Sequence, residues 1–149
     1  MSIHPFEKMS AVVKSKTAAM KLAVEKAVIQ TATAGSDAII EATPVDTTKA
    51  VANWKVTHGS PFTGVVGERV PGSKKGSGAR AAKSAMRAEN VGRIKFFKNK
   101  VAMYIANNVR YIGLLEYGSS KRKPHGMVSK GLQAMRLRAS TIRIFNTKP

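Results

Sequence analysis

The sequence contains no cysteine and no long hydrophobic run. Without cysteine the chain has no disulfide, no thiolate zinc site and no cysteine nucleophile. No uninterrupted apolar run approaches the ~20 residues that a membrane-spanning helix needs. The first seven residues lack the basic and apolar segments of a secretory signal. These absences fit a chain made in a reducing cytoplasm and predict no membrane partner.

The sequence also lacks the residue groupings that catalysis and metal binding need. His4, His58 and His125 are scattered without the spacing of metal ligands, and the eight acidic residues offer no carboxylate pair. No serine lies in a nucleophile elbow. The glycine-rich run at residues 72–76 does not have the spacing of a phosphate-binding loop. The sequence therefore predicts no enzyme activity, no cofactor and no metal site.

Positive charge is what the chain has in excess, with a formal net charge of +18. Residues 1–49 carry 6 basic and 5 acidic side chains, residues 50–100 carry 11 and 2, and residues 101–149 carry 9 and 1. Such a surplus attracts polyanions or a strongly acidic protein surface. The alternative is a merely solubilising surface, but most surfaces of that kind intersperse both signs.

One long helix is predicted over residues 4–42. Pro5 suits the first helical position, and Glu7 lies near the positive end of the helix dipole. A helix this long extends ~55 Å, more than a domain of this size can cover, so we expect part of it to pack on a neighbouring subunit. The alternative is a helix broken at Gly35 into two pieces. The apolar and small residues that form its stripe are Phe6, Met9, Val13, Met20, Val24, Ala27, Ala34 and Ala38.

Pro44 is expected to end this helix, because the residue before a proline is pushed away from helical geometry. Asp46 and the two threonines after it are typical of a turn, and we prefer this interpretation to a catalytic acid. A strand is predicted over residues 50–57. Trp54, the only tryptophan, is interpreted as the core anchor between sheet and helix, in preference to a ligand-stacking residue.

Residues 59–80 form a predicted basic loop, rich in glycine, proline and serine. Val65 and Val66 are the one place in it where a short strand is compatible with the sequence. The rest is interpreted as a mobile basic arm that contains Lys74, Lys75 and Arg80.

The second half of the chain alternates helix and strand. A helix is predicted over residues 79–97, with Phe96 and Phe97 closing the core, and a strand over residues 101–106. A buried one- or two-turn helix over residues 111–117 ends at Gly118 and delivers a rigid cationic loop, residues 119–126. Residues 127–137 are expected to form a helix or a strand. The basic tail, residues 138–149, is expected to form a short strand at 141–145 or a frayed end.

Together these elements predict a single domain, residues 1–149, with an α+β fold. The long N-terminal helix packs on a small antiparallel sheet with one or two further helices, and the sheet and helix core covers residues 50–137.

Several short motifs follow one another over residues 40–130. They are Thr43-Pro44-Val45-Asp46-Thr47, Asn53-Trp54, Tyr104-Ile105, Asn107-Asn108, Tyr111, Leu115-Glu116-Tyr117-Gly118, Ser120-Lys121, Pro124 and Gly126-Met127. No single motif is specific, but their order and spacing resemble the tail-completion (head–tail joining) family of long-tailed double-stranded DNA bacteriophages. Thr48 stands where the family usually has glycine, and Lys123 where it has alanine.

The resemblance implies a structural virion protein that forms a ring at the neck, where the tail meets the head. The ring is a hexamer by analogy, with a dodecamer as the alternative. Its neighbours would be head-closure, adaptor or portal, and tail-tube or terminator proteins, with genomic DNA in the lumen. The residues we expect at inter-ring or DNA-facing contacts are Lys74, Lys75, Arg80, Lys121, Arg122 and Lys123.

The charge alone permits a different function, that of a basic nucleic-acid-binding protein acting through non-specific phosphate contacts. The sequence has no helix-turn-helix spacing, zinc motif or stacking aromatic motif that would give such a protein base specificity.

Overall fold

The computed structural model describes residues 5–69, 74–97 and 102–144, and in these ranges the chain has the predicted α+β fold. The predicted element ends at His4, Val101 and Phe145 lie outside the described residues. None of the described helices is long and apolar enough to cross a membrane. The elements in chain order are α1 (Pro5–Ala42), α2 (Lys49–Ala52), β1 (Lys55–His58), α3 (Ala79–Lys95), β2 (Met103–Ala106), α4 (Ile112–Tyr117) and α5 (Met127–Thr141).

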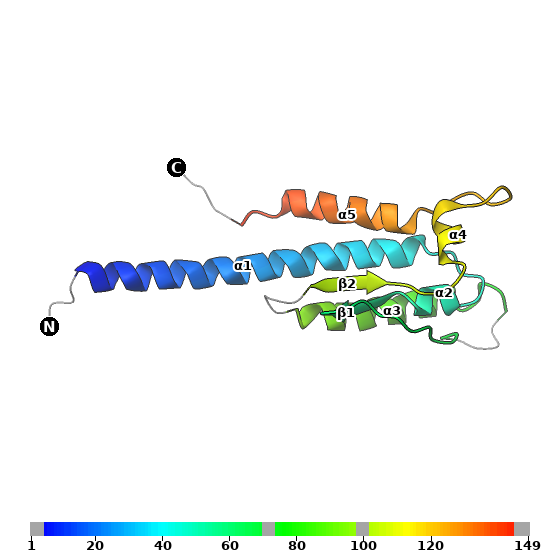
Figure 1. Ribbon diagram of the computed structural model, residues 1–149, viewed down its shortest axis with the longest axis horizontal. Helices are drawn as coiled ribbons and strands as arrows, with labels where there is room; N and C mark the ends of the chain where they lie inside the picture. Colours follow the sequence, from blue (N-terminus) through cyan, green and yellow to red (C-terminus); the bar gives the residue numbers. More distant parts are fainter. Residues whose placement is uncertain (1–4, 70–73, 98–101, 145–149) are drawn as a thin grey trace.

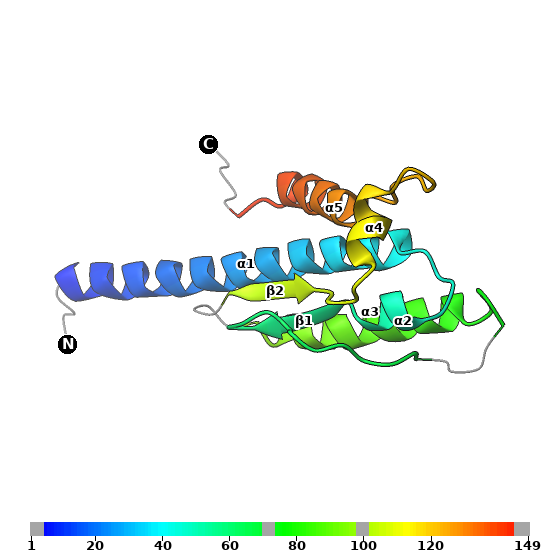
Figure 2. The same cartoon turned by 45° about the vertical axis from the view of Figure 1, so that its right-hand side comes forward.

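Helix α1 runs along most of the length of the molecule, and the other elements gather around its C-terminal half (Figure 1). Helix α5 lies on one side of α1, and the sheet with α3 lies on the other (Figure 2). The short helices α2 and α4 sit near the C-terminal end of α1. The N-terminal half of α1 projects beyond everything that packs on it.

The sheet has two antiparallel strands, β1 and β2. The predicted strand over residues 50–57 is wrong in its first half, because residues 49–52 form the helical turn α2. Ala50, Val51 and Ala52 are all buried, so burial does not alternate from one residue to the next as it does in a strand with one solvent-exposed face. The paired residues are Lys55↔Ala106, Val56↔Ile105, Thr57↔Tyr104 and His58↔Met103.

Trp54 lies in the core between α1 and the start of β1, as predicted, and is only 4% exposed. Its indole Nε1 donates a hydrogen bond of 2.9 Å to Oγ1 of Thr43, which in turn donates to the carbonyl of Ile39 at 2.7 Å. Asn90 on α3 donates to the carbonyl of Trp54 at 3.0 Å. The tryptophan therefore ties the end of α1 to α3 and to the sheet. The core cluster is Ile39, Ile40, Val51, Trp54, Ala82, Met86 and Met127.

Gly35 marks the crossing of α1 and α5 and does not break the helix, which is continuous over 38 residues. A Cβ at Gly35 would collide with Met135 of α5. A Cβ at Gly131 of α5 would lie 2.5 Å from Cγ1 of Ile39 and 3.2 Å from the carbonyl oxygen of Gly35. The two glycines thus let the helix backbones approach closely.

The C-terminal segment is a helix, the first of the two predicted alternatives, and it continues to Thr141. No strand is assigned over residues 141–144, so the predicted strand is absent from the described part of the tail. Phe96 is 78% exposed, which makes the prediction that it closes the core wrong. Helix α3 ends at Lys95, two residues before the predicted end, and Phe96 is its C-cap residue.

The segment from residue 59 to residue 69 contains no strand, and side chains of the body hold it in place. The amide of Asn53 donates to the carbonyl of Val66 at 2.9 Å and accepts from its N–H at 2.7 Å. The N–H of Arg69 donates to Oγ1 of Thr48 at 2.8 Å, and Asn108 donates to the carbonyl of Phe62. Four hydrogen bonds to Asn53, Thr48 and Asn108 thus connect residues 59–69 to the rest of the chain.

Glu89 on α3 gathers three cations from three parts of the chain. Its carboxylate lies 2.8 Å from Nζ of Lys55 and 3.5 Å from Arg93, and it pairs with Arg69. Burial alone would raise the pKa of Glu89. The hydrogen bond from Lys55 and the positive charges of Lys55, Arg69 and Arg93 outweigh burial and hold this pKa below its ordinary value.

Replacing Glu89 by glutamine is expected to lower the free energy of unfolding by about 1–2 kcal/mol near neutral pH, because three cations lose their counter-charge. The native pKa is the lower one, so this stabilisation is complete above the ordinary value of 4.5 and is lost as the pH falls through the native value. Urea unfolding near neutral pH and at about pH 3 measures it, and the deficit should shrink in acid. The exposed Glu68, replaced by glutamine, is the control. An equal deficit of Glu89→Gln at both pH values would contradict the assignment.

Candidate assembly and docking surfaces

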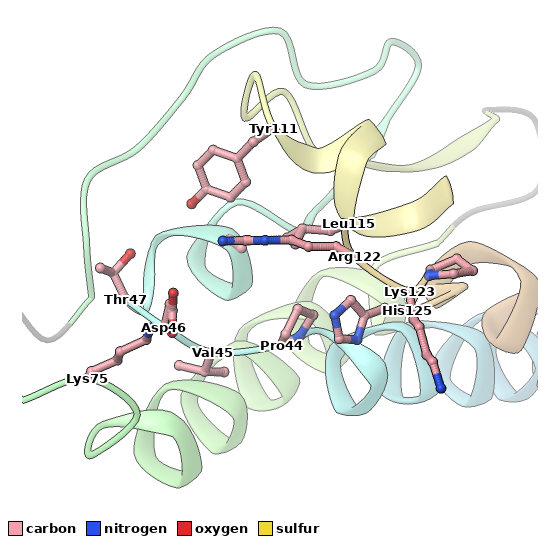
Figure 3. A pocket seen from close by; sticks show the side chains of 12 residues that line it. Pro44, Val45, Asp46, Thr47, Lys75, Tyr111, Leu115, Arg122, Lys123 and His125 are labelled. Carbon is pink, nitrogen blue, oxygen red and sulfur yellow. Dashed lines mark ion pairs between the residues drawn. The ribbon is translucent and has the colours of Figure 1, made fainter. Parts of the chain in front are cut away.

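A basic pocket of about 840 Å³ lies where the turn after α1 meets α4 and the cationic loop (Figure 3). Lys75, Arg122, Lys123 and His125 line it, and Asp46 is its only carboxylate. Arg122 extends across the hollow toward the turn after α1 (Figure 3). The remaining lining residues are Pro44, Val45, Thr47, Ala50, Tyr111, Leu115 and Pro124. The pocket thus combines cationic groups with an apolar floor.

The cationic loop is closed by backbone hydrogen bonds at both ends. Gly118 has φ +78°, a left-handed conformation that glycine adopts readily, and a Cβ there would lie 2.7 Å from the carbonyl oxygen of Arg122. Ser119 and Arg122 pair through both backbone N–H groups, at 2.9 and 3.2 Å. The N–H of His125 donates to the carbonyl of Leu115 at 2.9 Å. The loop therefore presents its cations from a fixed backbone.

Glu116 connects the loop to α5 and is only 8% exposed. Its carboxylate accepts hydrogen bonds from the N–H groups of Val128 and Ser129, at 2.9 and 3.3 Å. These N–H groups lie in the first turn of α5, where a negative charge is favourable. Helix α4 therefore provides the cap of α5, a role that the sequence spacing did not reveal.

Three of the six predicted contact residues, Lys75, Arg122 and Lys123, come together in the basic pocket, and the other three do not line it. Lys75 pairs with Asp46 at 3.1 Å, and the N–H of Gly76 donates to the carbonyl of Asp46 at the same distance. These contacts connect the segment that precedes α3 to the turn after α1. Lys74, Lys121 and Arg80 are exposed.

Among the lining residues that the sequence did not single out, Tyr111 and His125 face the same hollow (Figure 3). Both could have been included in the predicted contact site, because Tyr111 directly precedes α4 and His125 lies in the cationic loop. Helix α4 is less buried than predicted, because Leu114 and Tyr117 are exposed. Tyr117, 83% exposed, is the most exposed large apolar side chain among the described residues.

A second surface is the N-terminal half of α1, where several apolar side chains are left exposed by the described part of the chain. Phe6 is 77% exposed and Met9 is 63% exposed. The full set of exposed large apolar residues on this half is Phe6, Met9, Val12, Val13, Met20, Leu22 and Val24. Monomeric proteins rarely leave such a row uncovered, and its presence indicates an interaction site.

A third surface is an apolar groove of about 600 Å³ between α5 and β2, with α1 as its floor. Leu132 of α5 is 51% exposed within it. No lining residue is charged. The groove is lined by Ala27, Val28, Thr31, Ala32, Ile39, Phe97, Ala102, Met103, Ile105, Val128, Leu132 and Met135.

Within the described ranges, no three histidine, aspartate or glutamate side chains gather into a metal-binding group. Asp37 on α1 has a raised pKa, because burial outweighs the nearby positive charge of Arg87. Arg87 itself pairs with Glu41, so these groups form an ionic contact between α1 and α3. No histidine or nucleophile is hydrogen-bonded to Asp37 among the described contacts.

Comparison with protein-family models, with curated proteins and with solved structures finds no match for this chain. Its own surfaces are therefore what indicates its function.

Proposed function

We propose that this chain is a structural virion protein that forms a homo-oligomeric ring at the head–tail junction of a long-tailed bacteriophage. The ordered motifs over residues 40–130 motivate this proposal. The single observation that carries it is the N-terminal half of α1, which projects beyond the domain with seven large apolar side chains uncovered. A surface of that kind is stable in water when copies of the chain cover it for one another.

The joining role rests on the basic pocket and the surplus of positive charge. A ring with net charge +18 in each copy attracts acidic surfaces on adjoining rings and DNA in its lumen. Arg122 and Lys123 sit on a rigid loop, so little side-chain and backbone freedom is lost when a neighbour binds. The proposed neighbours are head-closure, adaptor or portal, and tail-tube or terminator proteins. They would contact the basic pocket and the exposed cations Lys74, Lys121 and Arg80.

Native mass spectrometry and negative-stain imaging of the purified chain test the assembly. We expect a closed ring, a hexamer in the first instance and a dodecamer as the alternative. Imaging of the assembled particle should then place copies at the neck. A chain that stays monomeric at high concentration, or a particle with no copies at the neck, would remove the proposal.

A second function, non-specific nucleic-acid binding, is favoured by the meeting of Lys75, Arg122 and Lys123 in one pocket. If these residues hold phosphates, replacing Arg122 and Lys123 by glutamine lowers the slope of log affinity against log salt by about 2 for duplex DNA. The matched control replaces Lys130 and Arg136, two exposed cations of α5, by glutamine. Gel shifts at rising salt measure the slope. A monomer with a steep slope favours this function, whereas a closed ring with an equal slope in both double variants opposes it.

A further inference from the structure

We propose that the apolar groove of one copy is the docking site for the N-terminal half of α1 of a second copy. This inference rests on the proposed ring, because it names the surface that the projecting helix covers on its neighbour. Each copy then donates one helix half and accepts another.

The groove and the projecting half of α1 belong to one apolar stripe. At 100° per residue, Phe6, Met9, Val13, Met20 and Val24 face the same side of the helix as the residues that form the groove floor. Those floor residues begin with Ala27, Val28 and Thr31. The apolar stripe therefore stays on one side of α1 from the projecting N-terminal half to the residues that form the groove floor. Helix α5 and strand β2 supply these walls (Figure 1).

The chemistry of the groove fits an apolar helix better than a charged partner. Its lining contains no charged side chain, and its floor contains the small residues Ala27 and Ala32, which allow close approach. Val128 and Leu132 on the α5 wall are half exposed and lack cover. A polar or cationic segment laid here would lose hydration without gaining a partner.

The projecting half of α1 has the length and the area to fill this site. From Phe6 to Val24 it extends ~27 Å at 1.5 Å per residue. Five of its seven exposed large apolar side chains lie on this stripe, whereas Leu22 lies on the opposite side of the helix. The five present an area on the order of several hundred square ångström, against ~800 Å² per partner in a standard protein interface. The N-terminal half of α1 is thus an apolar helix that matches the chemistry of the groove.

Because donor and acceptor surfaces differ, the contact is either repeated head to tail, which closes a ring, or exchanged reciprocally between two copies. In both arrangements the groove is incomplete until a second copy enters it.

Cross-linking tests the contact directly, because the chain contains no native cysteine. Copies carrying Val13→Cys or Met20→Cys are co-expressed with size-tagged copies carrying Leu132→Cys and treated with a short bismaleimide. We expect the mixed product at least about fivefold more with one of these stripe positions than with Ala18→Cys, since proximity raises the effective concentration. Ala18 is exposed and lies about 140° around the helix from Val13.

A charge substitution gives the second measurement. The double variant Val13→Asp and Met20→Asp should fold normally, since both side chains are exposed, and should lose the wild-type assembly in native mass spectrometry. The double variant Ala11→Asp and Ala18→Asp, which adds the same charge at two exposed positions off the stripe, should keep it. An assembly that persists in the double variant, with no excess of cross-link to Leu132→Cys, overturns the docking and leaves the ring standing. A monomeric wild type overturns both proposals.

Discussion

Replacing Trp54 by alanine is expected to lower the free energy of unfolding by ~3–5 kcal/mol, the largest effect of any single substitution considered in this chain. The indole is 4% exposed and packs in the core cluster between α1, α2 and α3. Alanine leaves a cavity and also removes the hydrogen bond of 2.9 Å to Thr43. Urea unfolding followed by circular dichroism measures the loss, because the variant has no tryptophan fluorescence.

Trp54→Phe separates the two contributions. Phenylalanine keeps most of the buried ring but cannot donate to Thr43, so its deficit should be clearly smaller than that of alanine, by about 1–2 kcal/mol or more. A loss below about 1 kcal/mol for Trp54→Ala would show that the side chain is exposed in solution.

Replacing Gly131 by valine is expected to cost about 1–3 kcal/mol, the second largest effect. Its Cβ would lie 2.5 Å from the side chain of Ile39 and 3.2 Å from the carbonyl oxygen of Gly35. The second of these atoms is backbone and cannot rotate away, so α5 has to move off α1. Thermal unfolding reports the cost, and since α5 is a wall of the groove, the same variant should also weaken assembly.

The matched control for this variant is Gly92→Ala, in the interior of α3. A Cβ at Gly92 meets nothing within 4 Å, so alanine should stabilise the chain by up to ~1 kcal/mol through its higher helix propensity. Opposite signs for the two variants identify the close helix crossing as the cause. A gain in stability for Gly131→Val would contradict the packing of α5 on α1.

The long helices could be predicted because their signals are local. Pro5 and Pro44 bracket α1, and the spacing of apolar residues in the segments of α1 and α3 is helical. The turn α2 could not, because Ala50, Val51 and Ala52 satisfy a strand pattern as well as a helix pattern. What decides between them is distant: Asn107 donates to the carbonyl of Ala50 at 2.8 Å.

The candidate surfaces were predictable only where their residues are contiguous. The cationic loop is one run of sequence, so its position after a short helix could be predicted. The basic pocket also needs Lys75 beside Asp46, a contact between residues that lie far apart in the sequence. The groove combines α1, β2 and α5, which contact only after folding. The exposure of Phe96 could not be predicted, because two adjacent aromatic residues before a strand are typical of a hydrophobic core.

The unsupported half of α1 has a consequence for how much of this protein survives in a cell. Most of the stability of a helix in a protein comes from tertiary packing, so we expect this half to open more often than the rest of α1 in a free copy. Five lysines, Lys8, Lys14, Lys16, Lys21 and Lys26, then become cleavage sites for a trypsin-like protease. In the proposed ring, docking of the apolar stripe would keep this half helical and so protect these lysines from cleavage. Surplus copies would be degraded while incorporated ones persist, so turnover itself would match supply to the number of places to be filled.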